Sequence, residues 1–222
     1  MLETTNYTVP HALLQEAIES IPNIDSRLSL NRPTGRFFND PWEIKSEFKG
    51  TVWEKILSIL NEPKGEARLI RLPQGTCYVS HADIDDRWHL PLTGNNAYLI
   101  DLEDHRMYQT TEQGRWYSMD AGRRHTAANF GSCDRVQLVV RKLLPIPNIK
   151  NPKNISITLK DVVVERRFIF DDVISPWLNY AYKRGIIANF KGEDLVASMT
   201  IESEYIDQLC DLTKEYFNLT VL

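Results

Sequence analysis

Eight short β-type runs dominate the middle of this sequence. They lie at 67–72, 76–80, 87–92, 97–102, 105–110, 114–119, 125–130 and 135–144. Turn-forming residues separate most of them: Pro73-Gln74-Gly75, Thr93-Gly94-Asn95-Asn96, Glu112-Gln113-Gly114, Asp120-Ala121-Gly122 and Gly131-Ser132. Short strands at such regular spacing are typical of a sandwich or a barrel. Their number matches the double-stranded β-helix, the jelly roll of cupin-like proteins, so we predict a mainly β fold with that core and flanking helices.

The segment before the predicted barrel follows a helical pattern instead. Apolar residues recur at helical spacing in 10–21 and again in 51–60. Turn residues at 32–36 and 39–41 separate these two stretches. We therefore predict that residues 1–66 form a helical and loop segment that packs on a barrel core at 67–144.

Prolines mark the end of the barrel, because a proline interrupts a continuing β-ladder. The remaining residues, 145–222, are predicted to form a small α/β extension. We expect strands at 156–159 and 162–170, a helix from Ser175-Pro176 to Gly185, and a last helix that Thr200 caps and that carries Tyr205, Ile206, Leu209, Leu212 and Tyr216 on one side. This extension has no cluster of ligand-type side chains, so we expect it to pack against the barrel or to form a homodimer contact.

Charge and hydropathy exclude several classes of partner. The chain of 222 residues is long enough for one sizeable core, and its net charge of −4 argues against a surface that coats nucleic acid. No apolar stretch approaches the ~20 residues of a membrane helix. The first residues do not have the pattern of a signal peptide. We therefore expect a cytoplasmic protein that binds neither nucleic acid nor a membrane.

His81, Asp83 and His125 form the first motif that carries chemistry. His81 and Asp83 are two residues apart, so their side chains point to the same face of an extended segment. His125 begins another predicted strand, 44 residues after His81. Two imidazoles and one carboxylate are the set that holds a non-haem Fe(II) and leaves positions open for O2 and a co-substrate. We predict that these three residues bind the metal, and we predict no catalytic side chain beyond them.

Arg135 lies ten residues after His125, on the last predicted strand. Alternation places Val136, Leu138 and Val140 on one face of that strand and Arg135, Gln137, Val139 and Arg141 on the other. An unpaired buried guanidinium is costly, so an inward Arg135 requires an anionic ligand, and its planar fork suits a carboxylate. Iron with a carboxylate-bearing co-substrate is the chemistry of 2-oxoglutarate oxygenases. The alternative is that the Val/Leu face is the interior and Arg135 points into solvent.

Arg87 and His89 share one face of the strand at 87–92, whereas Trp88, Leu90 and Leu92 share the other. An additional Arg and His beside the metal suit a second carboxylate, either of the co-substrate or of the substrate. The alternative for His89 is a core histidine with a satisfied hydrogen bond.

Taken together, these motifs resemble those of a known family. The shared elements are Gly75-Thr76, His81, Arg87-Trp88-His89-Leu90-Pro91-Leu92, Gly114-Arg115-Trp116, His125, Asn129 and Asp134-Arg135. This combination is similar to the aspartyl/asparaginyl β-hydroxylase-like group of Fe(II)/2-oxoglutarate-dependent oxygenases, which also includes free-proline hydroxylases. The resemblance covers roughly residues 67–144.

The resemblance implies a dioxygenase that uses Fe(II), 2-oxoglutarate and O2 and that releases succinate and CO2. Its substrate would be an unactivated C–H of an amino acid, a peptide side chain or a small metabolite. By the same resemblance, His81, Asp83 and His125 would hold the iron. Arg135 would pair with the far carboxylate of 2-oxoglutarate, and Arg87 and His89 would lie near its metal-bound end.

The sequence departs from the family pattern at a few positions. Asp83 is present, whereas some animal members lack this carboxylate ligand. Gln137 stands where several members have His, and Ile70 lies near the position of a co-substrate-binding Ser in the animal enzymes. Two alternatives stay open: a cupin-like metal-binding protein without 2-oxoglutarate-dependent activity, and a metal-dependent isomerase or dioxygenase that does not need Arg135.

Overall fold

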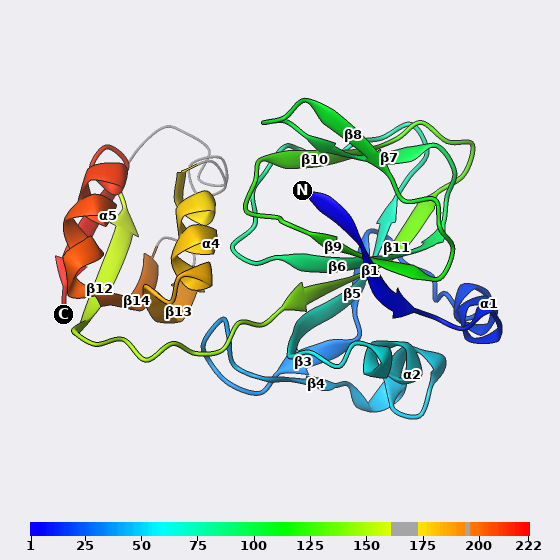
Figure 1. Ribbon diagram of the computed structural model, residues 1–222, viewed down its shortest axis with the longest axis horizontal. Coiled ribbons are helices and arrows are strands. Elements are labelled where there is room, and N and C mark those ends of the chain that lie inside the picture. The colour runs from blue at the N-terminus through cyan, green and yellow to red at the C-terminus, as the bar shows by residue number, and fades with distance from the viewer. Residues whose placement is uncertain (161–172, 194–195) are drawn as a thin grey trace.

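The computed structural model describes residues 1–160, 173–193 and 196–222. A barrel of two antiparallel sheets forms its main body, and the C-terminal extension lies beside it (Figure 1). The larger sheet has the strand order β1-β9-β6-β11-β5-β2, and the smaller sheet has the order β10-β7-β8. The bounds are β1 Leu2–Thr8, β2 Arg27–Ser29, β5 Lys64–Leu72, β6 Arg87–Thr93, β7 Ala97–Asp101, β8 Arg106–Gln109, β9 Arg115–Met119, β10 His125–Asn129 and β11 Arg135–Lys142.

The segment 77–81 adds an eighth piece to the barrel, at the edge of the smaller sheet. It pairs with β10 at two isolated bridges, Cys77 with Ala128 and His81 with His125. From β5 to β11 the chain then passes back and forth between the two sheets, and each sheet receives four of the eight pieces. This is the arrangement of a double-stranded β-helix, so the predicted fold class is confirmed.

Strand pairing in the larger sheet decides which side chains face the barrel interior. On β11, Gln137 lies opposite Ile70, and Val139 lies between Arg68 and His89. Directly paired residues project from the same face of a sheet. Arg68, Ile70 and His89 line the cavity inside the barrel, so Arg135 faces the interior together with Gln137, Val139 and Arg141, and the predicted alternation of this strand is confirmed.

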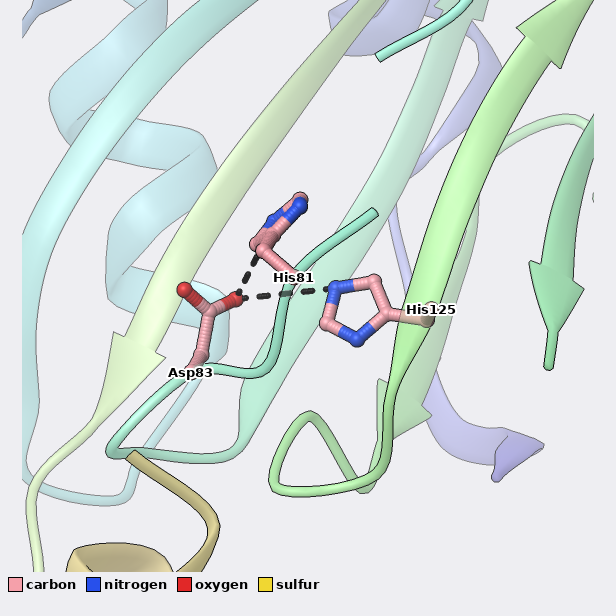
Figure 2. A group of neighbouring side chains, drawn as sticks. All are labelled: His81, Asp83 and His125. Atoms are coloured by element: carbon pink, nitrogen blue, oxygen red, sulfur yellow. Dashed lines mark ion pairs between the residues drawn. The ribbon is translucent and has the colours of Figure 1, made fainter. Parts of the chain in front are cut away.

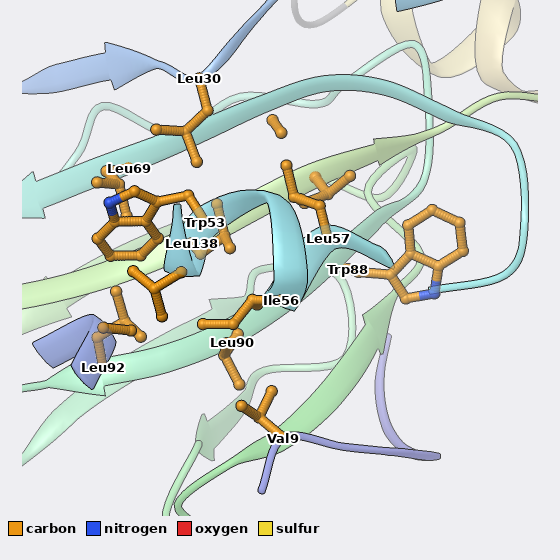
Figure 3. Close-up of a cluster of buried hydrophobic side chains, with 14 of the residues drawn as sticks. Val9, Leu30, Trp53, Ile56, Leu57, Leu69, Trp88, Leu90, Leu92 and Leu138 are labelled. Carbon is orange, nitrogen blue, oxygen red and sulfur yellow. The ribbon is translucent and has the colours of Figure 1, made fainter. Parts of the chain in front are cut away.

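The opposite face of the larger sheet is buried as well, because two helices cover it. They are α1 (His11–Glu19) and α2 (Val52–Ile59), which agree with the helices predicted at 10–21 and 51–60. Figure 3 shows Trp53, Ile56 and Leu57 of α2 packed on Leu90 and Leu138 of the sheet. This cluster explains how a Val/Leu face can be buried without facing the barrel interior. A fully buried leucine contributes about 1.5–3 kcal/mol.

The N-terminal residues also add strands that the sequence did not suggest. β1 pairs with β9, and the short β2 pairs with β5, so both extend the larger sheet. The prediction of a purely helical and loop segment at 1–66 was therefore incomplete. The remaining short elements of this region are β3 (Asn31–Pro33), β4 (Trp42–Ile44) and the 3-10 helix η1 (Ser46–Phe48).

The extension after the barrel is an α/β unit with its own apolar cluster. Its sheet has the order β13-β14-β12-β15, and Figure 1 shows α4 on the side of the extension that faces the barrel. The bounds are β12 Pro152–Leu159, α4 Ser175–Lys183, β13 Ile187–Glu193, β14 Val196–Glu202, the 3-10 helix η3 Ser203–Tyr205, α5 Ile206–Thr213 and β15 Phe217–Val221.

Two predictions for the extension need comment. Thr200 does not cap a helix: it lies inside β14, where Ala197, Met199 and Ile201 alternate as buried residues, and α5 begins only at Ile206. The period-two burial of 196–202 outweighed the capping preference of a single threonine. The strand predicted at 162–170 lies outside the described residues.

Candidate metal centre and co-substrate cavity

The structure brings His81, Asp83 and His125 together at one end of the barrel interior (Figure 2). Oδ2 of Asp83 lies 3.9 Å from Nε2 of His81 and 3.7 Å from Nε2 of His125. One ligand atom from each residue lies within 4.8 Å of the other two. Ligand atoms that are each about 2.1 Å from a shared ion lie about 3–4 Å apart, so the spacing is close to what a metal requires.

Backbone carbonyls orient both imidazoles. Nδ1 of His81 lies 2.9 Å from the carbonyl oxygen of Val79, and Nδ1 of His125 lies 2.7 Å from that of Arg123. A carbonyl can only accept, so each Nδ1 carries the proton and donates it. Nε2 of each ring is left to face Asp83. This is the tautomer that a metal-ligating histidine needs.

Asp83 is ionised and is held by Arg87. Nη2 of Arg87 lies 2.7 Å from Oδ1 of Asp83, which leaves Oδ2 directed toward the two histidines. Burial alone would raise the pKa of the Asp83 carboxyl, but the positive charge of Arg87 outweighs burial and holds the pKa below its ordinary value. Burial lowers the pKa of His125, so its ring stays neutral.

Arg87 belongs to a longer chain of buried charges. It also contacts Asp85 at 3.2 Å, and Asp85 in turn accepts a short hydrogen bond from Nε of Arg141. The guanidinium of Arg141 lies over the ring of Phe38, 3.5 Å from its centroid. Arg87 was predicted to bind the co-substrate, and that prediction stays untested. The structure adds that Arg87 already has two carboxylate partners and orients a candidate ligand.

Arg135 lies deeper in the same cavity and differs from the other arginines. Its side chain is buried, and among the described residues it makes no ion pair. Burial lowers its pKa to about 10, with a small opposing effect of Tyr78. The group therefore remains a cation at neutral pH. Arg135 and Gln137 also border a second, polar pocket of about 310 Å³ near the turn at 93–97.

His89 faces the cavity between Arg87 and Arg135. Burial lowers its pKa to about 3, so the ring is neutral. Nδ1 lies 3.0 Å from Oε1 of Gln137 and donates to it, while Nε2 has no partner among the described residues. In this arrangement Nε2 can accept but not donate. The predicted contact of His89 with a carboxylate therefore requires the Gln137 amide to turn over, which exchanges donor and acceptor.

Sequence reasoning missed other residues of the site. Asp85 and Arg68 both belong to its charged network, and Tyr78 lines the cavity. The spacing of Asp83 and Asp85 was a usable signal, because two residues apart in an extended segment share a face. Arg68 had the same kind of signal, since it alternates with the buried Ala67 and Leu69.

The extension contacts the two loops that lead to the candidate ligands. Asp86 accepts hydrogen bonds from Asn179 at 3.3 Å and from Lys183 at 2.9 Å, both on α4. Lys183 also contacts Asp120 at 2.8 Å, shortly before His125 in the chain. The two loops are joined directly as well, because the backbone N–H of Asp83 donates to the carbonyl of Ala121. The extension is thus part of the surroundings of the site.

A comparison with family models agrees with the resemblance seen in the sequence. Residues 48–145 match the family described as aspartyl/asparaginyl beta-hydroxylase, a segment slightly shorter than half of the chain. Over that segment the resemblance inferred from sequence is confirmed, and with it the enzyme class, a hydroxylase. The match reaches back beyond the predicted barrel and includes α2. No curated protein matches the chain.

Three solved structures show a distant likeness. A cupin domain from Bordetella pertussis is 20% identical, with 37% of this chain and 85% of that chain covered and a TM-score of 0.32. An oxidoreductase of the 2OG-Fe(II) oxygenase family from Burkholderia pseudomallei is 10% identical, with 59% and 77% covered and a TM-score of 0.40. A prolyl-4-hydroxylase from Pseudomonas putida is 13% identical, with 65% and 92% covered and a TM-score of 0.39.

Among the described residues, no helix combines the length and the apolar character that crossing a membrane requires.

Proposed function

We propose that this protein is an Fe(II)/2-oxoglutarate-dependent dioxygenase that hydroxylates an unactivated C–H bond and releases succinate and CO2. The observation that carries the proposal is Arg135, a buried cation without a carboxylate partner among the described residues, in the same cavity as His81, Asp83 and His125. Burying a lone charge costs several kcal/mol unless a counter-charge arrives. A dicarboxylate supplies that charge at one end and metal ligands at the other.

The residues present fit these groups. Two imidazoles with free Nε2 atoms and one ionised carboxylate are the donor set that suits a non-haem Fe(II). When bound, the iron supplies the activation of O2 for the oxidation of the substrate C–H bond. Arg87 holds Asp83 in position, and Arg135 neutralises the far carboxylate of 2-oxoglutarate. The buried cavity excludes bulk water from the reaction.

The proposed setting is the cytoplasm, where 2-oxoglutarate and reduced iron are available. The substrate would be an amino acid, a peptide side chain or a small metabolite. The alternative, a metal-binding protein without 2-oxoglutarate chemistry, predicts the same three ligands but gives Arg135 no role.

The first experiment measures succinate formed from 2-oxoglutarate, with and without added Fe(II), in the presence of an amino-acid and peptide panel. Iron-dependent succinate and a +16 mass shift in one panel member are expected. His125→Ala should abolish both, because two remaining ligands hold a divalent ion poorly. Metal binding without iron-dependent succinate would favour the alternative function.

The second experiment replaces Arg135, the proposed partner of the far carboxylate of 2-oxoglutarate. Arg135→Ala should keep its iron but require about 100- to 10,000-fold more 2-oxoglutarate, the equivalent of roughly 3–5 kcal/mol. We also expect Arg141→Ala to affect the 2-oxoglutarate requirement much less. Arg141 is buried against Asp85 and Phe38, however, so its loss also disturbs folding. Arg71→Ala is therefore the cleaner control, since Arg71 pairs with Asp134 at the surface. An unchanged 2-oxoglutarate requirement in Arg135→Ala would refute the assignment of Arg135 as the partner of the far carboxylate.

A further inference from the structure

The metal cavity is not the only space that Arg135 borders. A second pocket of about 310 Å³ is lined by the turn at 93–97 and by residues of 109–113, and Arg135 and Gln137 line both this pocket and the metal cavity. The volume is at the lower end of the range for small-molecule sites. The proposed function uses Arg135 only from the metal side, so the second pocket has no part in it.

Charge distinguishes the second pocket from the metal cavity. Among the described residues, Arg135 is the only charged side chain that lines the pocket, and it makes no ion pair. The other polar side chains of the lining are neutral, namely Thr93, Asn95, Asn96, Gln109, Thr110, Thr111, Gln113 and Gln137. The metal cavity, in contrast, contains the carboxylate of Asp83. An anion that enters the second pocket therefore meets one cation and no carboxylate, which favours its binding.

Side chains at the mouth of the second pocket are available to a ligand. Gln109, Thr111 and Gln113 are exposed, and their side chains make no hydrogen bond among the described residues. Amide and hydroxyl groups donate to oxygen atoms without adding a charge. Arg135 is only 6% exposed, so it lies at the inner end of the pocket and not at its mouth. A buried cation with neutral donors around it suits an oxyanion.

The wall of the second pocket is in place before any ligand binds. Gly94 has a φ of 103°, and a Cβ added there would lie 2.8 Å from Cα of Arg135. A glycine is therefore required for the turn to pack against Arg135. The next residue is fixed as well, because Oδ1 of Asn95 accepts from the backbone N–H of Ser132 at 3.1 Å. A preformed wall reduces the ordering cost of binding.

We propose that the second pocket binds a small oxyanion, a carboxylate or a phosphate, which shares the guanidinium of Arg135 with 2-oxoglutarate. A guanidinium has five N–H donors, and a bidentate carboxylate engages two of them, so ligands in two cavities can both reach it. The two anions repel each other, and one positive charge does not neutralise both. Each ligand therefore weakens the binding of the other by the same factor. The oxyanion would thus raise the concentration of 2-oxoglutarate that the protein requires.

Titration calorimetry with inorganic phosphate and with acetate tests the site. The full chain is used without metal, so that neither probe can bind to an ion in the metal cavity. At least one probe should bind saturably, with a Kd of roughly 0.1–10 mM. The tighter of the two shows whether the pocket prefers a phosphate or a carboxylate. Absence of saturable binding for both probes would overturn the proposal.

Variants at the mouth separate the second pocket from the metal cavity. Gln113→Leu and Thr111→Val should each weaken binding of the anion roughly 3- to 10-fold, because each removes a neutral donor. Both should leave the affinity of the Mn(II)-loaded protein for 2-oxoglutarate unchanged. Gln208→Leu, at an exposed position of α5, is the matched control. Arg135→Met should weaken binding of both ligands. Normal anion binding in both mouth variants would place the anion elsewhere, even if Arg135→Met failed to fold.

The competition is measured on the Mn(II)-loaded protein. The probe that binds more tightly should, when saturating, weaken 2-oxoglutarate binding at least about fivefold. At the same probe concentration the effect should be smaller in Gln113→Leu. An equal effect in Gln113→Leu and in the unaltered protein would mean that the anion acts inside the metal cavity, and the second pocket would lose its role.

The competition rests on the proposed function, whereas the anion site does not. If Arg135→Ala leaves the 2-oxoglutarate requirement unchanged, the proposed role of Arg135 in the oxygenase fails. Anion binding to the metal-free protein that is still sensitive to Gln113→Leu would then retain the site. Conversely, an oxygenase whose metal-free form binds neither probe would keep its proposed function and have no anion site.

Discussion

The two faces of the larger sheet belong to the same strands but differ in chemistry: one is apolar, and the other carries charged side chains. On the helix-covered face, Leu138 and Val140 pack among the apolar side chains of α1 and α2. On the barrel face, Arg141 pairs with the buried Asp85, and Arg135 is a buried cation that makes no ion pair among the described residues. Charged groups are poor sources of folding free energy, whereas a large apolar cluster is a good one. We infer that the apolar face stabilises the sheet, which allows the barrel face to hold charged side chains in position for ligands.

The largest difference between the two faces is expected for a matched pair of substitutions on adjacent residues of β11. Val140→Ala removes two methyl groups from the packed face and should lower the free energy of unfolding by about 2–3 kcal/mol. Val139→Ala removes the same groups beside an existing cavity and should cost about 1 kcal/mol. Urea denaturation of both variants measures the difference. Equal losses would mean that the two faces are packed alike.

A second test asks whether the barrel face behaves as a dry interior. The pKa of His89 is about 3 in the folded protein, against an ordinary value of 6.5, because the ring is buried. Below pH 6.5 His89 becomes protonated in the unfolded chain but stays neutral in the folded protein. The free energy of unfolding therefore falls as the pH is lowered through this range. Between pH 7 and pH 5 the loss from His89 should be about 2 kcal/mol.

Urea denaturation of the metal-free protein at these two pH values measures that loss. His89→Gln should flatten the pH dependence by this amount, whereas His11→Gln, at an exposed position of α1, should not change it. An identical slope in His89→Gln and in the unaltered protein would show that water reaches the ring.

The smallest effect is expected at the contact with the extension. Lys183 joins Asp86 and Asp120, and its side chain is 35% exposed, so solvent screens the pair. Lys183→Met should weaken Mn(II) binding about two- to fivefold, since the loops that carry Asp83 and precede His125 lose a shared anchor. Lys214→Met removes a fully solvated partner of Asp211 and serves as the control. Titration calorimetry measures the Mn(II) affinity of both variants. Identical affinities would mean that the extension does not support the metal centre.

Local patterns predicted the barrel well, and they also indicated that His81, Asp83 and His125 lie close together. Alternation along one strand is a local property, so the sequence alone could place Arg135 on the face opposite Val136, Leu138 and Val140. It left open which of the two faces is the barrel interior, because both are buried. What required the structure was pairing between distant segments. Asp85 meets Arg141 only because β6 lies beside β11. Likewise, β1 pairs with β9, and β12 pairs with β14 and β15, all of them far away in the chain. The alternation within a short segment such as 196–202 indicates a strand but does not identify its partner.

The edge segment 77–81 has a consequence for local unfolding. Among the described residues it pairs with β10 alone, through five backbone hydrogen bonds between 75–81 and 125–129, whereas β11 is paired along most of its length on both sides. Edges with few ladder bonds open at a lower free energy than the centre of a sheet. His81 therefore belongs to one of the less firmly paired parts of the barrel, while His125 lies on the neighbouring strand. An ion shared by the two would act as a cross-link between these strands, and part of its binding free energy would close the edge of the barrel.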